Sequence, residues 1–180
     1  MRYGWDISTS IVGMAEFDNS GKFIRAEHCD LRKVDGLNEK ADVFRIFVED
    51  YVKRIENNTH FVEERLGNFA AGRSMLQTLM KLAAFNAVCS FILYHNDAQC
   101  KVVHIHPSTW KSIMKHEGLI IPKGTDKKKE LTLQFVTSHV DGFNVPRNKN
   151  ANPQPWAFDM ADAYCIGRSG YLRLCNVKES

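Results

Sequence analysis

The sequence has few of the features that mark secreted, zinc-binding or membrane-spanning proteins. Its five cysteines are an odd number and include no C-x-x-C pair, which argues against a disulfide framework and against a structural zinc site. The N-terminal run MRYGWD has no apolar core of the kind that a signal peptide needs. The longest apolar stretch, residues 82–94, is far shorter than the ~20 residues of a membrane span. We therefore expect a protein of the reducing cytoplasm with no membrane partner.

The chain also lacks a strong net charge. Its 24 Lys and Arg residues against 21 Asp and Glu residues give a net charge of +3, so no global field of one sign points to a partner. Hydrophobic residues make up 44% and charged residues 25% of the sequence, which excludes disorder as a description of the whole chain. The length of 180 residues predicts one domain, residues 1–180.

Hydrophobic periodicity predicts an α/β domain. The first three strands, at 3–7, 11–17 and 23–31, form an antiparallel meander. A helix at 38–55 with Asn38 as its cap, a strand at 60–62, a helix at 74–94 and a strand at 102–105 follow. The helix at 74–94 is apolar all round and is expected to be more deeply buried than the first. The remainder is predicted as a helix at 108–115 with Ser108 as its cap, a helix at 126–139, a loop at 141–155 and a last helix at 155–172.

Acidic residues follow two of the predicted strands. Asp6 ends the first strand, and Glu63 comes directly after the strand at 60–62. Ligand sites in open α/β sheets lie at the carboxyl ends of strands. Taken alone, Asp6 is also typical of a turn or cap, and Glu63 of a solvated sheet edge. Glu64 is an alternative to Glu63, because adjacent residues of a strand point to opposite faces of the sheet.

Two further acids lie in the last predicted helix. Asp159 and Asp162 are three residues apart and therefore share a helix face. The pair alone also suits a solvated face near a helix N-terminus. If this helix meets Asp6 and Glu63, four carboxylates share one small volume, and they stay fully ionised only with divalent cations. Oxygen-only ligands favour Mg²⁺ or Mn²⁺, and two such ions support phosphodiester hydrolysis.

Four motifs, taken in order and spacing, resemble the RuvC-type Holliday junction resolvases, particularly their phage-encoded relatives. They are GWDISTS at 4–10 with Gly13, VEE at 62–64, PSTWK at 107–111 and DMADAY at 159–164. The resemblance covers nearly the whole chain. It implies an RNase H-like fold with a central mixed five-stranded sheet flanked by helices. By position it assigns Asp6, Glu63, Asp159 and Asp162 as catalytic residues and metal ligands.

The resemblance also implies an activity. Such a protein is a homodimeric endonuclease that nicks two opposed strands of a four-way DNA junction with Mg²⁺, for which Mn²⁺ can substitute, at two ions per site. It would work in the cytoplasm of a bacterium or of a phage-infected host. The helix at 74–94 is the expected dimer interface, because it has more apolar surface than one sheet face covers. An RNase H-type or general nuclease and a non-catalytic junction-binding protein are the alternatives.

Lysines gather in one segment of the sequence. Six lie within 19 residues, namely Lys111, Lys115, Lys123, Lys127, Lys128 and Lys129. Such a run is also typical of a solvated face, but a nuclease needs local positive charge to hold phosphates. The resemblance favours Lys111 and either Lys128 or Lys129 as DNA-binding residues.

Two further residues are candidates for DNA contact, and two histidines for a metal. Arg73, at the start of the helix at 74–94, is a candidate phosphate ligand. Phe69, in the preceding loop, either stacks on an unpaired base or folds into the core. His104 and His106 share a strand face as zinc ligands do, but no third ligand of matching spacing is present. We interpret them as ordinary strand residues.

Overall fold

The computed structural model describes residues 1–53, 57–64, 73–96 and 100–176, and its centre is a mixed sheet of five strands in the order β3-β2-β1-β4-β5. The first three strands pair antiparallel, while β4 runs parallel to both β1 and β5. The predicted meander and the mixed five-stranded sheet are confirmed. The strands are β1 (Arg2–Asp6), β2 (Ile11–Phe17), β3 (Phe23–Asp30), β4 (Thr59–Glu63) and β5 (Lys101–Ile105).

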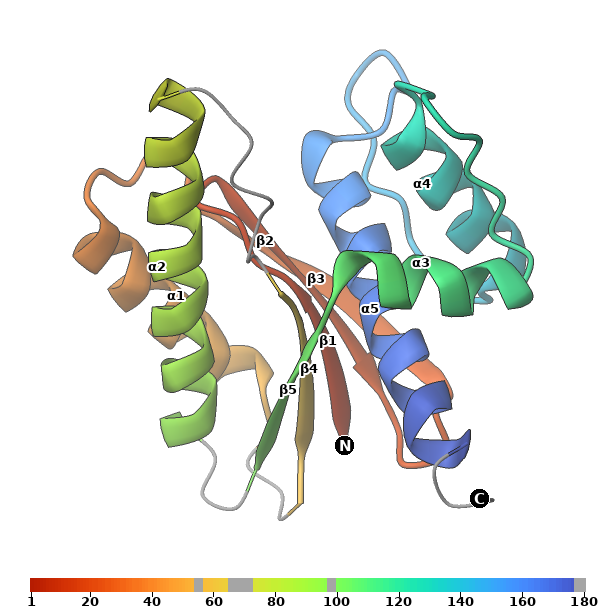
Figure 1. The fold of residues 1–180 in the computed structure, drawn as a ribbon, viewed down its shortest axis with the longest axis horizontal. Coiled ribbons are helices and arrows are strands. Elements are labelled where there is room, and N and C mark those ends of the chain that lie inside the picture. Colours follow the sequence, from red (N-terminus) through yellow and green to blue (C-terminus); the bar gives the residue numbers. More distant parts are fainter. Residues whose placement is uncertain (54–56, 65–72, 97–99, 177–180) are drawn as a thin grey trace.

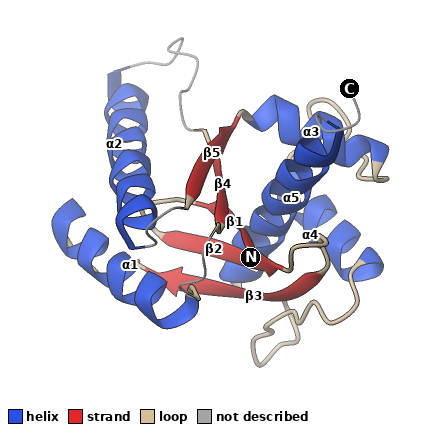
Figure 2. Ribbon diagram, turned by 90° about the horizontal axis from the view of Figure 1, so that it is seen from below, coloured by secondary structure: helices blue, strands red, loops and turns tan. Residues whose placement is uncertain are grey.

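Helices cover both faces of the sheet, which confirms the predicted fold class (Figure 1). On one side, α1 lies beside α2 (Figures 1 and 2). On the other side, α5 crosses the strands, and α3 and α4 pack against it. The helices are α1 (Leu37–Tyr51), α2 (Arg73–Asn96), α3 (Pro107–His116), α4 (Lys128–His139) and α5 (Pro155–Asn176).

Several helix ends differ from the predicted ones. The cap of α1 is Gly36, which has a positive φ of 78° and no side-chain cap bond, so the prediction of Asn38 was wrong. The cap of α3 is His106, whose ring accepts from the Ser108 backbone N–H at 3.2 Å. Pro107 occupies the first helical turn because it has no N–H to satisfy, and this moves the cap upstream of Ser108. Helix α4 begins at Lys128 rather than at residue 126.

Strand alternation divides the core into two layers. Tyr3 and Trp5 of β1 face α1, where Trp5 packs edge-on against Phe44 with ring centroids 5.6 Å apart. Gly4 and Asp6 must then face the opposite side, towards α5, because successive side chains of a strand alternate. The same rule puts Glu63 of β4 on the α5 side. Both acids at the ends of these strands therefore point towards the same helix.

Helix α2 is less buried than predicted. Phe85, Cys89 and Leu93 recur every four residues and face the core. The opposite side is exposed and carries large apolar side chains, of which Phe91 is 59% accessible. The segment Leu76–Asn96 is long and apolar enough to cross a membrane by length and composition alone, a test that a core helix of a soluble protein also passes. Its apolar character therefore does not imply complete burial.

Helix α5 lies unusually close to the sheet, and glycines make this approach possible. A Cβ on Gly4 would stand 2.1 Å from the Ala163 carbonyl oxygen. A Cβ on Gly13 would stand 2.1 Å from the Asp159 carbonyl oxygen. On the helix side, a Cβ on Gly167 would stand 3.0 Å from Gly4 backbone atoms. The helix backbone therefore rests on the strand backbones of β1 and β2 without side chains between them.

We predict that Gly13→Ala lowers the melting temperature. The added methyl group would collide with the α5 backbone at Asp159, which cannot move as a flexible side chain can. Overpacking of this kind costs about 1–3 kcal/mol, or roughly 3–10 °C for a chain of this size. Calorimetry of both proteins measures the shift, with Gln134→Ala on the exposed side of α4 as a control that should melt with the wild type. Equal melting temperatures for Gly13→Ala and the wild type would contradict the close approach.

Candidate active site

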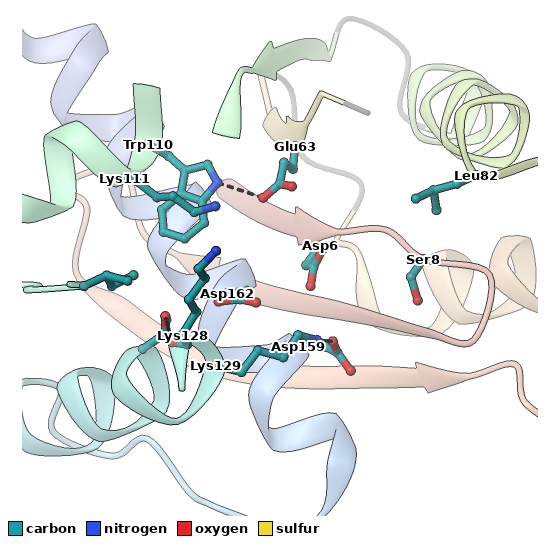
Figure 3. Close-up of a pocket in the computed structure, with 12 residues that line it drawn as sticks. Asp6, Ser8, Glu63, Leu82, Trp110, Lys111, Lys128, Lys129, Asp159 and Asp162 are labelled. Atoms are coloured by element: carbon teal, nitrogen blue, oxygen red, sulfur yellow. Dashed lines mark hydrogen bonds and ion pairs between the residues drawn. The ribbon is translucent and has the colours of Figure 1, made fainter. Parts of the chain in front are cut away.

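The four acids predicted from the sequence line one pocket of about 340 Å³ (Figure 3). It opens between the sheet, α5, α4 and the start of α3. The predicted convergence is therefore observed, while the roles of these acids in catalysis and metal binding stay predictions. The other lining residues are Ser8, Leu82, Trp110, Lys111, Ile121, Lys128, Lys129 and Thr132.

The sheet register places the first two acids side by side. In the parallel pair of β1 and β4, Trp5 lies opposite Val62, so Asp6 and Glu63 follow at the same end of adjacent strands. Both are buried. Glu63, rather than Glu64, lines the pocket. On the other side of β1, Asp6 pairs with Gly13 of β2. The α5 backbone at Asp159 lies directly over this glycine.

Two of the acids accept short hydrogen bonds from side chains on other elements. The Trp110 indole Nε1 donates to Glu63 Oε2 at 2.7 Å, and the Lys129 ammonium donates to Asp159 Oδ1 at 2.6 Å (Figure 3). Burial alone would lower the pKa of Lys129. The hydrogen bond to Asp159 and the charges of the nearby carboxylates outweigh burial and raise this pKa above its usual value. Lys129 is therefore a cation at neutral pH.

Asp162 is the acid whose ionisation the site opposes. Burial, followed by the negative charge of Asp6, raises the pKa of Asp162 well above its usual 3.8. The charges of Glu63 and Asp159 act in the same direction, and Lys129 opposes them. One lysine thus compensates only part of the negative charge that four carboxylates bring to this pocket, which is the situation in which a further cation is favoured.

The donor set fits a hard divalent cation in its chemistry. All four acids offer carboxylate oxygens, which Mg²⁺ and Mn²⁺ prefer over nitrogen or sulfur ligands. Within residues 1–53, 57–64, 73–96 and 100–176, no three His, Cys, Asp or Glu side chains lie close enough together to hold one ion as they stand. Binding an ion would therefore require these carboxylates to draw together, with Lys129 giving up part of its contact with Asp159.

A second cavity of about 790 Å³ adjoins the acidic pocket. The two share Lys111, Ile121 and Lys128. Besides these two lysines, Lys115 and Lys123 line the second cavity, and no acid is among its lining residues in the described part of the chain. We call this cavity, between α3 and the segment that leads to α4, the lysine groove. Of the basic run, Lys115 and Lys123 line only the groove and Lys129 lines only the acidic pocket, whereas Lys111 and Lys128 line both.

The remaining predicted site residues lie elsewhere. Phe69 is outside the described residues, and Arg73 begins α2, with its side chain also outside them. His104 Nε2 lies 3.0 Å from Ser90 Oγ on α2, and His106 caps α3. Both histidines therefore have structural partners. Trp110 also lines the pocket and was not predicted as a site residue, although its place in the PSTWK motif beside Lys111 was a signal.

We predict that Asp162→Asn raises the melting temperature when no divalent cation is present. Because the folded-state pKa of Asp162 is raised, its ionisation costs folding free energy at pH values above 3.8. The amide removes this penalty, so at pH 8 in EDTA the variant should melt roughly 2–4 °C higher, or about 1 kcal/mol. At pH 3 the carboxyl is mostly protonated in both states, and the difference should shrink. A variant with a lower melting temperature than the wild type at pH 8 would contradict the repulsion between Asp162 and the neighbouring carboxylates.

Comparison with known proteins identifies the fold. No protein-family model and no curated protein matches the sequence. Among solved structures, Thermus thermophilus RuvC in complex with a Holliday junction substrate is 14% identical, with a TM-score of 0.58 over 97% of this chain and 95% of that one. Fowlpox virus resolvase in complex with Holliday junction DNA is 17% identical, with a TM-score of 0.54 over 96% and 97%. The yeast mitochondrial Holliday junction resolvase Ydc2 is 16% identical, with a TM-score of 0.56 over 99% and 80%. The chain therefore has the RNase H-like fold found in the Holliday junction resolvases.

Proposed function

We propose that this protein is a divalent-metal-dependent endonuclease that resolves four-way DNA junctions by paired nicking. One observation carries the proposal: four carboxylates from two strands and one helix share a pocket that opens onto a groove lined by lysines. This combination places a site that can hydrolyse one phosphodiester beside a surface that can hold the neighbouring phosphates of the same DNA strand. The proteins with similar structures include resolvases solved with Holliday junction DNA.

The acids are the hydrolytic part of the proposal. Asp6, Glu63, Asp159 and Asp162 would hold the divalent ions, which supply an activated water and stabilise charge on the leaving oxygen. The backbone that carries them belongs to two inner strands of the sheet and to a helix that rests directly on the sheet. Such rigid supports suit a site whose ligands must keep one geometry during the reaction.

The lysines are the substrate-holding part. Lys111 and Lys128 lie where the acidic pocket meets the lysine groove. A DNA strand that runs along the groove into the pocket would therefore have phosphates within reach of both lysines. Contacts of this kind fix the position of the strand without reading its sequence. Lys129 has a different task, because it neutralises Asp159 in the absence of metal. We propose that it turns to a phosphate once an ion binds.

The exposed side of α2 is the proposed dimer interface. Its large apolar side chains lie within about a third of the helix circumference, because each residue advances ~100° around the axis. They are Met80, Val88, Phe91 and Tyr94. A second copy of the same surface would cover them in a two-fold arrangement, which is the commonest symmetry of homodimers. Two symmetric active sites are what paired nicking needs.

We predict that Asp6→Asn, Glu63→Gln, Asp159→Asn and Asp162→Asn each abolish nicking in Mg²⁺ while leaving junction binding in Ca²⁺ within about twofold of the wild type. Each change removes one ligand charge but preserves the shape of the side chain. Glu64→Gln is the matched control, and it should keep most of the activity because Glu64 is not among the pocket residues. Nick mapping on labelled four-way junctions measures all five variants.

The same assay separates the competing functions when its substrates are varied. Paired nicks on four-way junctions, with little cutting of linear duplex or RNA/DNA hybrid, support the proposal. Preferential cutting of the hybrid would instead support an RNase H-type nuclease. Tight junction binding without any cutting in Mg²⁺ or Mn²⁺ would support a non-catalytic junction-binding protein.

We predict that Phe91→Glu converts a dimer into a monomer. The carboxylate would lie in the middle of the exposed apolar side of α2. A second copy packed there would bury this charge without a partner, which is costly. Light scattering should give a mass near 20.6 kDa for the variant and about twice this for the wild type. Ile24→Glu, at an exposed apolar position of β3, is the control and should remain dimeric. A monomeric wild type, both free and on junction DNA, would contradict this interface.

A further inference from the structure

Trp110 is the one large aromatic side chain among the residues that line the acidic pocket in the described part of the chain. It lies in the first turns of α3 and is only 2% exposed. Its indole Nε1 donates to Glu63 Oε2 at 2.7 Å. The bond joins residues 47 positions apart in sequence and links α3 to the end of β4. A buried aromatic residue thus contacts a proposed metal ligand directly.

The packing around Trp110 holds its ring in place. It belongs to the core cluster that also contains Phe61 of β4, Met114 of α3 and Ile166 of α5. The start of α3 is itself fixed by the His106 cap. An indole N–H can only donate a hydrogen bond, so a fixed ring offers Glu63 a donor in one direction. The distance of 2.7 Å lies at the short end of the range for an N–H···O hydrogen bond.

The same ring also contacts a proposed DNA-binding residue. The Lys111 ammonium lies over the Trp110 ring, 5.0 Å from its centroid, within the range of a cation–π interaction. Lys111 is one of the two lysines shared by the acidic pocket and the lysine groove. One side chain therefore orients a carboxylate through its edge and supports an ammonium through its face (Figure 3).

We infer that Trp110 is a positioning residue: its indole N–H holds the Glu63 carboxylate in the orientation that receives a divalent cation. The inference rests on the proposed metal-dependent nuclease function. Groups that donate to or accept from a metal ligand set its direction, and their loss typically weakens metal affinity or activity by ~10–100-fold. Trp110 acts through Glu63 and does not itself bind the ion.

The chain contains a matched control for the loss of a buried indole N–H. Trp5 is fully buried, and its Nε1 donates to His60 Nδ1 at 3.1 Å. It packs in the α1 layer, on the face of the sheet opposite Asp6. Trp5→Phe and Trp110→Phe each keep an aromatic ring and remove one buried donor. A merely structural role for Trp110 predicts the same consequences for both variants.

The first test is a Mn²⁺ titration of the DNA-free protein, followed by the electron paramagnetic resonance of unbound Mn²⁺. It compares the wild type with Trp110→Phe, Glu63→Gln, the double variant and Trp5→Phe. Trp110→Phe should bind Mn²⁺ about tenfold more weakly than the wild type. In the Glu63→Gln background, the same change should have no further effect, because two residues that act as a unit are not additive. Trp5→Phe should bind Mn²⁺ as the wild type does.

The second test measures nicking of a four-way junction against Mg²⁺ concentration. For Trp110→Phe, the Mg²⁺ concentration at half-maximal rate should rise about tenfold, while junction affinity in Ca²⁺ stays within twofold. Wild-type Mn²⁺ affinity in Trp110→Phe, or a full additional loss in the double variant, would overturn the positioning role and leave the proposed nuclease intact. A wild type that neither binds Mn²⁺ nor nicks any junction would overturn the proposed function, and the positioning role with it.

Discussion

The direct contact between the backbone of α5 and the backbones of β1 and β2 is the constraint on which the rest of this structure depends. A helix that packs on a sheet through ordinary side chains is held above it by those side chains, whereas here glycines at positions 4, 13 and 167 remove them at the contact. A Cβ on Gly4 or Gly13 would meet backbone atoms of α5 at distances that real Cβ atoms do not show, and a Cβ on Gly167 would meet the Phe17 ring and the Gly4 backbone. The helix axis and its height above the strands are therefore set by backbone contact.

This contact brings the acids of the site together and thereby also creates the electrostatic repulsion among them. It brings Asp159 over Gly13, the strand partner of Asp6, so acids from different elements share a small buried volume. Burial and mutual repulsion then raise the pKa of Asp162, and Lys129 offsets only part of the excess charge. Sites of this kind are retained for function rather than for stability. The geometry that destabilises the free protein is the one that favours a divalent cation.

The two sides of the sheet differ in the residues that they present. The α5 side carries the acids, Trp110 and the lysine groove. On the other side, α2 packs with one face on the core and leaves the opposite face apolar and exposed. Large exposed apolar surfaces on soluble proteins mark interaction sites. In the proposed function, one side of the sheet cuts DNA and the other brings two cutting sites together.

Local sequence patterns determined the strands, the order of the elements and the four acids, because strand alternation and helical spacing are properties of neighbouring residues. The resemblance to resolvases added the mixed sheet and the convergence of the acids. Local sequence patterns did not predict the features that depend on contacts between distant segments of the chain. The apolar residues of α2 predicted burial, but its exposure depends on how much surface α1 and the sheet can cover. Trp110 has the sequence pattern of an ordinary core residue, and only the fold places Glu63 of β4 beside its indole. Which lysines line the groove and which line the acidic pocket depends on how α3 and α4 pack. Those contacts join residues far apart in the chain, so only the tertiary structure decided them.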